Sequence, residues 1–408
     1  MKKRWICCQL GAREHYSIPR ALHRAGTPTA LVTDFWTSPG GAWKFVPSEP
    51  VRQRYHSELG NIEVVAMNWR TLAFEPALRA RWRGWERIQA RNHWFQRHAV
   101  RDLQKRLNTE QQSGVVFSYS YTAREIFRCA KEAGWTTVLG QIDAGPVSER
   151  LVSELYRGFP EFAPAWRAAP PSYWKEWLEE CQLADRVVVN STWARDALVE
   201  AGVPERKLYV IPLAYEPPKP TIPPRSYPPA FTPARPLRVL FLGQVSLGKG
   251  MALVFEAIRL LRDEPVEFRV VGEIQLVIPN DLMRDRIVEF VGPVPRDEVT
   301  QHYEWADIFL FPTFSDGFGI TQLEAQAFSL PVIASRFCGD VVEHGRNGLL
   351  LDQLNTETIV DAIRYLLRLP SEIEKMSAAS GLDERFSIDW LGSQLKALVE
   401  SVGAVTNV

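Results

Sequence analysis

The sequence has no hydrophobic run long enough to cross a membrane and no excess of charge of either sign. Its strand-like apolar stretches, such as Leu237–Leu242, fall far short of the roughly 18 residues that a spanning helix requires. The 48 Lys and Arg side chains balance the 48 Asp and Glu side chains. These absences predict a protein that does not span a bilayer and has no general affinity for nucleic acid or other polyanions.

Cysteine is scarce, with five residues in 408, and none lies in a C-x-x-C pair or at a zinc-binding distance from histidine. Reduced, buried thiols in a cytoplasmic protein are therefore predicted. The start of the chain is basic, but its apolar stretch, residues 5–10, is too short for a signal peptide and is predicted to be the first strand. Asn190-Ser191-Thr192 matches a glycosylation acceptor but is predicted to begin a helix instead.

Proline is concentrated in one segment, residues 216–236, where nine of 21 positions are proline. Such a stretch cannot continue a helix or a central strand, so it is predicted to be a linker between domains. The linker separates an N-terminal domain, residues 1–215, from a C-terminal domain, residues 237–383. Residues 384–408 are predicted to form a C-terminal helix that packs back on the N-terminal domain.

On both sides of the linker, short apolar runs alternate with helix-like segments, which is the pattern of β-α-β units. The predicted strands are residues 5–10, 30–33, 62–66, 114–118, 136–139, 186–190 and 208–211, then 237–243, 267–272, 288–292, 307–312 and 331–334. The fold class is therefore α/β, with two Rossmann-like doubly wound domains. Because ligands of parallel sheets bind beyond the carboxyl ends of the strands, the two domains are predicted to face each other across a binding cleft.

Two segments resemble phosphate-binding loops and fail the comparison. The segment that begins at Gly11 has one glycine where a nicotinamide-binding loop needs three. Residues 243–250 satisfy Gly-x(4)-Gly-Lys, but Gly250 stands where a nucleotide triphosphatase needs Ser or Thr to hold magnesium. Lys249 nevertheless follows a strand and precedes a predicted helix, residues 251–262, so it could neutralise a phosphate in the cleft. The alternative is a solvated lysine before a helix.

The stretch 312–327 reads as a strand end, a glycine turn and a helix that begins near residues 319–321. Asp316 lies in the turn and Glu324 in the helix. The free amides of a helix start can seat a phosphate or a sugar oxygen, and the carboxylates can accept hydrogen bonds from sugar hydroxyls, each worth about 1.5–3 kcal/mol. The alternative is an N-cap acid followed by a solvated glutamate.

This segment, with three others, resembles the signature of retaining, nucleotide-sugar-dependent glycosyltransferases of family four, which carry Glu-x(7)-Glu. The matching blocks are residues 315–325, 330–335 and 345–350 and the pair Lys249-Gly250. They cover the second domain; in the first, only residues 185–190 and 210–212 are family-like. The resemblance implies the GT-B fold, a donor in the second domain, an acceptor mostly in the first, and no bound metal or other cofactor, consistent with the lack of an Asp-x-Asp motif.

By this resemblance, Glu324 would hold the ribose of the donor, Asp316 the transferred sugar and Lys249 the diphosphate. Further donor contacts are expected from Gln244, Gly317, Phe318, Gly319, Ile320 and Thr321. The sequence departs from the family twice here, because Asp316 replaces Glu, and Gln244 stands where members usually carry a second diphosphate-binding cation, an arginine. Arg336 and Arg346 are the candidates to replace that charge.

On the acceptor side, the family often has a histidine after a first-domain strand. This chain has Gly140 to Gly145 there, so Gln141 or Asp143 would have to do its work. Gly11, Arg13 and His15 follow the first strand and are predicted at the cleft, where Arg13 and His15 could touch phosphate or acceptor and His15 could accept a proton. The alternative is an ordinary loop.

The stretch 70–106 carries ten basic side chains against three acidic ones, interleaved with Trp82, Trp85 and Trp94. On a helix this pattern suits an anionic membrane surface or a phosphorylated lipid acceptor. The alternative is an ordinary helix pair with tryptophans in the core and solvated arginines. The location is accordingly predicted as cytoplasmic, with peripheral contact to the inner membrane face under the first interpretation.

The sequence thus predicts a metal-independent retaining glycosyltransferase that moves a hexose from a nucleoside-diphosphate sugar to a glycan, a lipid-linked acceptor or a small molecule. The alternative, suggested by Gln244 and Asp316, is a catalytically weakened homologue that binds nucleotide-sugars or partner proteins without transfer. A sugar-nucleotide epimerase would need acid and base side chains at the sugar from both domains, and the sequence does not display them.

Overall fold

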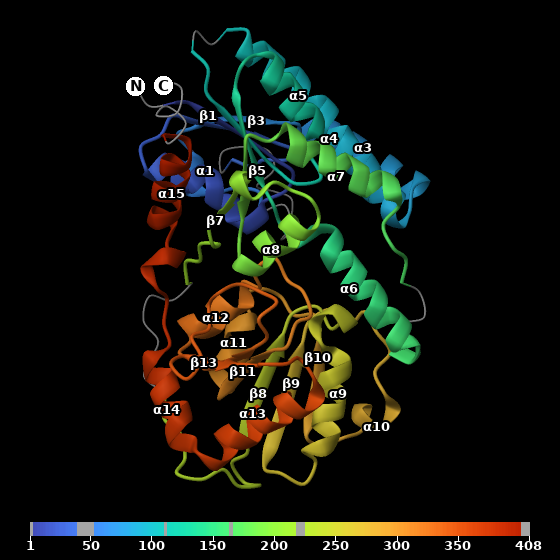
Figure 1. Cartoon of the computed structure of the whole chain (residues 1–408), viewed down its shortest axis with the longest axis vertical. Helices are drawn as coiled ribbons and strands as arrows, with labels where there is room; N and C mark the ends of the chain where they lie inside the picture. Colours follow the sequence, from blue (N-terminus) through green and yellow to red (C-terminus); the bar gives the residue numbers. More distant parts are fainter. Residues whose placement is uncertain (1–2, 39–52, 110–111, 163–165, 218–224, 401–408) are drawn as a thin grey trace.

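The structure, a computed structural model, describes residues 3–38, 53–109, 112–162, 166–217 and 225–400. Two parallel sheets lie one above the other (Figure 1). The first has the order β3-β2-β1-β4-β5-β6-β7 and the second β10-β9-β8-β11-β12-β13. The strands are β1 Trp5–Gln9, β2 Thr29–Thr33, β3 Glu63–Ala66, β4 Val115–Tyr119, β5 Thr136–Gly140, β6 Arg186–Val189, β7 Leu208–Val210, β8 Leu237–Leu242, β9 Val266–Val271, β10 Val288–Gly292, β11 Ile308–Phe311, β12 Val332–Ala334 and β13 Gly348–Leu350.

Helices connect the strands and cover both sheets, as right-handed parallel connections require. They are α1 Ser17–Arg24, α3 Asn68–Arg81, α4 Gly84–Leu107, α5 Arg124–Glu132, α6 Gly145–Gly158, α7 Pro171–Leu183, α8 Thr192–Glu200, α9 Met251–Leu260, α10 Asn280–Met283, α11 Val299–Trp305, α12 Thr321–Ala327, α13 Thr356–Arg368, α14 Pro370–Ala379 and α15 Ile388–Glu400. Ser191 accepts a hydrogen bond from the Ala194 amide at 3.0 Å, so the 190–192 segment begins helix α8 as predicted.

Each of the twelve predicted strands is present, with both ends within one residue of the prediction. They were predictable because strands buried on both faces read as continuous apolar runs. Strand β13 was missed. It has only three residues, and its Gly348 lies so close to β12 that an added Cβ would be 2.9 Å from the Val332 nitrogen, which leaves no room for the branched side chains typical of strands.

Two helices tie the halves of the molecule together. Helix α15 packs on α1, where Leu391 and Leu395 share a buried cluster with Ile18 and Leu22, so the end of the described chain lies on the first sheet's side (Figure 1). In the other direction, α6 runs from the first domain along the second, and Phe162 just beyond it enters the second core. The domain boundaries at 215, 236 and 383 remain predictions, and residues 218–224 and 401–408 lie outside the described residues.

All five cysteines are buried and unpaired, as predicted. In the ranges that the structure describes, no helix is both long and apolar enough to cross a membrane.

Candidate functional site between the two sheets

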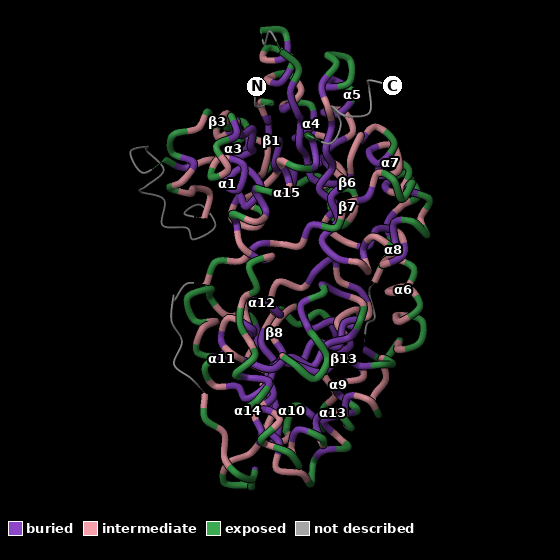
Figure 2. Tube along the Cα trace, turned by 60° about the vertical axis from the view of Figure 1, so that its left-hand side comes forward, coloured by how far each residue is buried: buried purple, intermediate pink, exposed green. Residues whose placement is uncertain are grey.

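The two domains touch through the segments that follow their strands. The Ser191 hydroxyl donates to the Gly317 carbonyl oxygen at 2.8 Å, and the Trp193 indole N–H donates to the Ser315 hydroxyl at 3.1 Å. In both views, α8 lies at the lower end of the first domain and α12 at the upper end of the second (Figure 1, Figure 2). The carboxyl ends of the two sheets therefore face each other, which is where ligands of such sheets bind.

Lys249 is held at this junction by the loop after β8. The loop ends in a short 3-10 helix, Leu247–Lys249, and turns at Gly250, whose φ of +79° and closeness to the Pro312 carbonyl require glycine. The Lys249 ammonium forms an ion pair with the Asp316 carboxylate, and the two side chains are only 21% and 22% exposed. Lys249 is therefore a mostly buried, paired cation at a strand end and not a freely solvated one.

The Asp316 turn is built by its own backbone. The second Asp316 carboxylate oxygen accepts a hydrogen bond from the Phe318 amide at 3.1 Å, and the Phe318 side chain is buried. The Phe318 amide thus positions the carboxylate, a role that differs from the predicted seating of the donor. Ile320 and Thr321 begin α12, whereas Gln244 is exposed in the loop after β8.

The glycines of the turn pack against other segments of the protein, where a side chain would not fit. A Cβ on Gly317 would lie 2.9 Å from the Asp143 Cα and still nearer the Ile142 carbonyl oxygen. A Cβ on Gly319 would lie 2.5 Å from the Phe311 ring. Gly317 is therefore the point at which the Asp316 turn meets the backbone of the first domain.

Glu324 lies in the first turn of α12. One of its carboxylate oxygens accepts a hydrogen bond from the Tyr303 hydroxyl at 2.7 Å. Burial raises the pKa of Glu324, while the Tyr303 hydrogen bond and the charge of Arg296 lower it. Such a partly buried carboxylate, with one oxygen committed to Tyr303, retains acceptor capacity for a pair of hydroxyl groups.

The loop after β1 has a backbone that its sequence does not reveal. Glu14, His15 and Tyr16 all have left-handed φ values, 51°, 50° and 60°. Left-handed non-glycine residues cost about 1–3 kcal/mol each and cluster at functional sites. Gly11, with φ +83°, starts the loop, and its amide donates to an Asp34 carboxylate oxygen at 2.8 Å.

Two charged side chains of this loop face the first sheet. The Arg13 guanidinium lies over the Tyr119 ring at 5.5 Å, and the Glu14 carboxylate accepts a hydrogen bond from the Tyr119 hydroxyl at 3.1 Å. Burial raises the pKa of Glu14. Arg13 is therefore packed at the carboxyl end of β4, as its predicted place at the cleft requires.

His15 contacts Arg296, which lies in the loop after β10, so this pair bridges the two domains. Burial, followed by the Arg296 charge, lowers the pKa of His15 to about 4. A neutral His15 then accepts a hydrogen bond from the guanidinium. Nothing in the sequence singles out Arg296, which lies at this contact between the domains. The predicted candidates, Arg336 and Arg346, instead pair with Asp352 and Glu343 and are 57% and 66% exposed.

The His15–Arg296 contact predicts a pH-dependent stability. Because the folded pKa of His15 lies below its unfolded value of about 6.5, its contribution is complete above pH 6.5 and is lost as the pH falls toward 4. We expect the melting temperature of His15→Gln to fall less between pH 7 and pH 4.5 than that of the unmodified chain. Parallel curves would show that folding does not lower the pKa of His15; His23→Gln is the control for a histidine outside this contact.

Gln141 and Asp143, the expected substitutes for the family histidine, form one hydrogen-bonded unit in which Gln141 is buried and Asp143 partly buried. The Gln141 side-chain amide donates to Asp143, and its oxygen accepts a hydrogen bond from the Trp177 indole at 3.0 Å. The same Asp143 carboxylate oxygen accepts from the Tyr121 hydroxyl at 2.7 Å and from the Gly145 amide at 2.9 Å. Burial raises the pKa of Asp143. Gln141 is thus a support for Asp143, and Asp143 is the group that reaches the domain junction.

The basic stretch 70–106 forms α3 and α4, and its tryptophans make contacts within the protein. Trp94 is buried and stacks on Phe74 at 4.8 Å. Trp85 packs on Tyr173 at 5.0 Å, and its indole donates to the Arg167 carbonyl oxygen. These contacts favour the helix-pair interpretation, and none supports contact with a membrane.

The second domain matches a known family, and the whole chain matches known structures. The crystal structure of Anabaena Alr3699/HepE in complex with UDP-glucose aligns with a TM-score of 0.59 at 15% identity over 99% of this chain and all of that one. Sucrose-phosphate synthase from Thermosynechococcus elongatus aligns with a TM-score of 0.64 at 15% identity over the full length of both chains. These alignments confirm the GT-B glycosyltransferase fold.

Residues 236–369, which lie in the second domain, match the family model described as Glycosyl transferases group 1. The D-inositol 3-phosphate glycosyltransferase of Pseudarthrobacter chlorophenolicus is 31% identical over 157 residues, which are 35% of this chain and 37% of the relative. The amylovoran biosynthesis glycosyltransferase AmsK of Erwinia amylovora is 27% identical over 197 residues, 44% and 46% of the two chains. Each match thus spans less than half of the relative.

Proposed function

We propose that this protein is a glycosyltransferase that moves a hexose from a nucleoside-diphosphate sugar to an acceptor bound mainly by the first domain. The observation that carries the proposal is the partly buried Lys249–Asp316 pair. Both residues follow strands within the segment that matches the group 1 model, and Asp316 lies in the turn before the helix of Glu324. A cation beside a carboxylate is what a sugar diphosphate needs, because the anionic and hydroxyl-bearing parts of the donor require opposite partners.

In this proposal the donor breaks the Lys249–Asp316 ion pair and binds both side chains. The diphosphate takes the Lys249 ammonium, and the released Asp316 carboxylate accepts hydrogen bonds from the hydroxyls of the sugar. As the bond from the anomeric carbon to the phosphate breaks, Lys249 stabilises the negative charge that develops on the leaving diphosphate. Retention at the anomeric carbon and independence of metal ions are parts of the proposal supported by the motif resemblance alone.

The test is a donor screen followed by a turnover assay. A bound donor raises the melting temperature by mass action, so UDP-glucose, ADP-glucose and GDP-mannose are compared with their free diphosphates. The donor that stabilises most is then assayed for release of nucleoside diphosphate. If no nucleotide-sugar stabilises the protein, the proposal fails.

Glu324→Ala is expected to weaken donor binding by about 10²–10⁴-fold, because two charge-assisted hydrogen bonds to the ribose hydroxyls are lost at about 1.5–3 kcal/mol each. The measurement is the donor Kd by calorimetry. Tyr303→Phe is the matched control, since it removes the hydroxyl that donates to Glu324 and leaves the carboxylate in place. Equal effects of the two substitutions would mean that Glu324 supports α12 and does not touch the donor.

A catalytically weakened homologue is the second candidate, favoured by the missing arginine at Gln244, which is exposed in the loop before Lys249. Gln244→Arg is expected to tighten the donor Kd about tenfold at low salt, by one additional charge-assisted hydrogen bond, and less at high salt. A looser Kd would show that another cation, such as Arg296, already occupies that space. Donor binding with no detectable release of diphosphate in either protein would favour the second candidate.

A further inference from the structure

A small aromatic pocket lies on the first domain where it meets the donor loops. Its volume is about 130 Å³, and its main side chains are Trp85, Tyr121, Asp143, Glu149, Tyr173 and Trp174. Val152, also in its wall, is 3.3 Å from the Cβ position of Gly248, the residue before Lys249. At another point of the wall, Asp143 abuts Gly317, the residue after Asp316. Two lining residues of the pocket therefore contact the chain neighbours of Lys249 and Asp316.

The walls of this inner pocket combine flat aromatic rings with carboxylates. Tyr121 and Tyr173 stack at 4.8 Å, and Trp174 meets the Tyr173 ring edge-on at 5.2 Å. Aromatic faces provide rigid, partly apolar surface that suits the C–H face of a sugar ring, and a few fixed polar groups then set its orientation. Asp143 and Glu149 are such groups, since a carboxylate accepts hydrogen bonds from hydroxyls.

The charge of the inner pocket excludes an anionic occupant. Asp143 and Glu149 are its charged side chains, and its lining includes no Lys or Arg. Burial raises the pKa of Asp143, and the charge of Arg13 acts in the opposite direction, but Arg13 is not part of the wall. A phosphate placed between two carboxylates and aromatic rings would be desolvated without a cation, which is unfavourable.

A larger groove of about 910 Å³ lies along the same two helices, α4 and α7, and shares no lining residue with the pocket. Trp85 and Tyr173 line the pocket, and their chain neighbours Glu86 and Ser172 line the groove. The groove lining contains no residue of the second domain, so it leads away from the donor loops.

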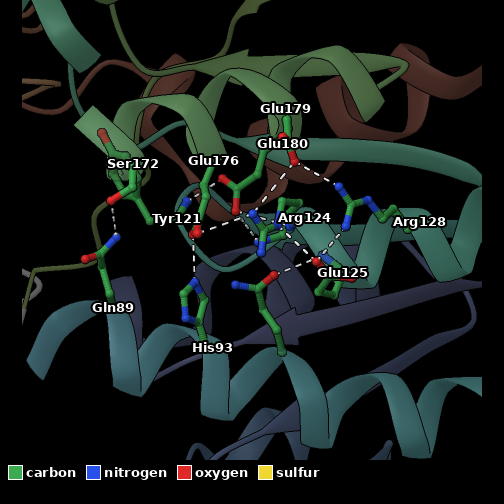
Figure 3. Close-up of polar contacts among 12 residues, drawn as sticks. Gln89, His93, Tyr121, Arg124, Glu125, Arg128, Ser172, Glu176, Glu179 and Glu180 are labelled. Atoms are coloured by element: carbon green, nitrogen blue, oxygen red, sulfur yellow. Dashed lines mark hydrogen bonds and ion pairs between the residues drawn. The ribbon is translucent and has the colours of Figure 1, made fainter. Parts of the chain in front are cut away.

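Polar pairs join the two helices along this outer groove (Figure 3). The Gln89 amide donates to the Ser172 hydroxyl at 3.3 Å, and the His93 imidazole is 2.7 Å from the Glu176 carboxylate, which also pairs with Arg124 at 3.3 Å. Trp82, with Phe74, adds aromatic surface. The groove thus combines aromatic rings with side-chain amide, hydroxyl, imidazole and ionic groups, among them Glu86 and Arg97, and such mixed groups suit a surface for several sugar residues.

We propose that the acceptor is an uncharged oligosaccharide, with its terminal residue in the inner pocket beside Asp143 and its following residues in the outer groove between α4 and α7. This inference rests on the proposed glycosyltransferase function and narrows its acceptor. It separates this protein from relatives whose names state a phosphorylated acceptor.

The experiment is a binding titration that is monitored by tryptophan fluorescence and by calorimetry. The neutral probes are maltopentaose, cellopentaose, mannopentaose and chitopentaose, each beside its monosaccharide, and the anionic probes are glucose 6-phosphate and inositol 3-phosphate. We expect one pentasaccharide to bind at least tenfold more tightly than its monosaccharide and than both anionic probes. If no pentasaccharide binds, if length brings no gain, or if an anionic probe binds best, the inference is overturned.

Three tryptophan variants localise the binding. Trp174→Ala is expected to weaken monosaccharide and pentasaccharide alike by about tenfold, whereas Trp82→Ala should remove only the gain from length. Trp69→Ala is the control, because Trp69 is 75% exposed and lines neither cavity. Unchanged affinities in both Trp174→Ala and Trp82→Ala would also overturn the inference.

Donor titrations of the same proteins separate this inference from the proposed function. If the unmodified protein binds a nucleotide-sugar donor but no oligosaccharide, the acceptor assignment alone is rejected. Oligosaccharide binding in a protein that binds no nucleotide-sugar rejects the proposed transferase activity while leaving a carbohydrate-binding groove. The melting temperature of each variant shows whether it is folded.

Discussion

Lys249→Ala is expected to lower kcat/KM for sugar transfer by about 10²–10³-fold, the usual effect of removing one charge-stabilising group from a water-poor site. The loss should be concentrated in kcat, because the charge on the leaving diphosphate grows as the glycosidic bond breaks. The fold should survive, since the lysine is on a loop and the partner that it leaves, Asp316, keeps the Phe318 amide. Release of nucleoside diphosphate from the best donor of the screen is the measurement.

Lys375→Ala is the matched control for this substitution. Lys375 also pairs with a carboxylate, that of Glu372, but it is 69% exposed on helix α14. Exposed pairs of this kind contribute at most about 1 kcal/mol to stability, so turnover and melting temperature should hardly change. Turnover in Lys249→Ala equal to that of the control would refute the placement of the diphosphate at Lys249.

The candidate site residues of the second domain could be predicted from the sequence because they lie in short, continuous segments. Asp316 and Glu324 are eight positions apart on one turn and helix, and Lys249 lies in the loop after β8, so both segments are brought to the edge where the parallel strands end. The fold was readable for a similar reason, since each buried strand is one continuous apolar run.

What the sequence could not show depends on pairs of residues far apart in the chain. His15 and Arg296 are 281 positions apart, and neither sits in a motif, so no local pattern joins them. The left-handed backbone of residues 14–16 is formed by Glu, His and Tyr, residue types that give no warning of it. The proposed acceptor pocket is assembled from α4, α6, α7 and the loops after β4 and β5, and only the tertiary structure brings these segments together.

Gly317→Ala is expected to reduce transfer about 100-fold while changing the donor Kd much less. The new Cβ would meet the Ile142 carbonyl oxygen and the Asp143 Cα, so the Asp316 turn and the acceptor pocket would have to move apart by a substantial fraction of an ångström. A displacement of about 1 Å between reacting groups costs on the order of 10²-fold in rate. The measurements are kcat with an oligosaccharide acceptor and the donor Kd by calorimetry.

Gly381→Ala provides the control, because this glycine is exposed and a Cβ there meets no atom within 4 Å. The comparison decides between two roles for Gly317. If Gly317 leaves space for the donor, the alanine Cβ blocks donor binding, and the donor Kd rises as transfer is lost. If the glycine serves the domain junction, the donor still binds and hydrolysis of the donor by water falls less than transfer to the sugar acceptor, because water needs no alignment of the two domains. The closeness of Ile142 to Gly317 favours the second outcome, and a rise in donor Kd equal to the fall in transfer would contradict it.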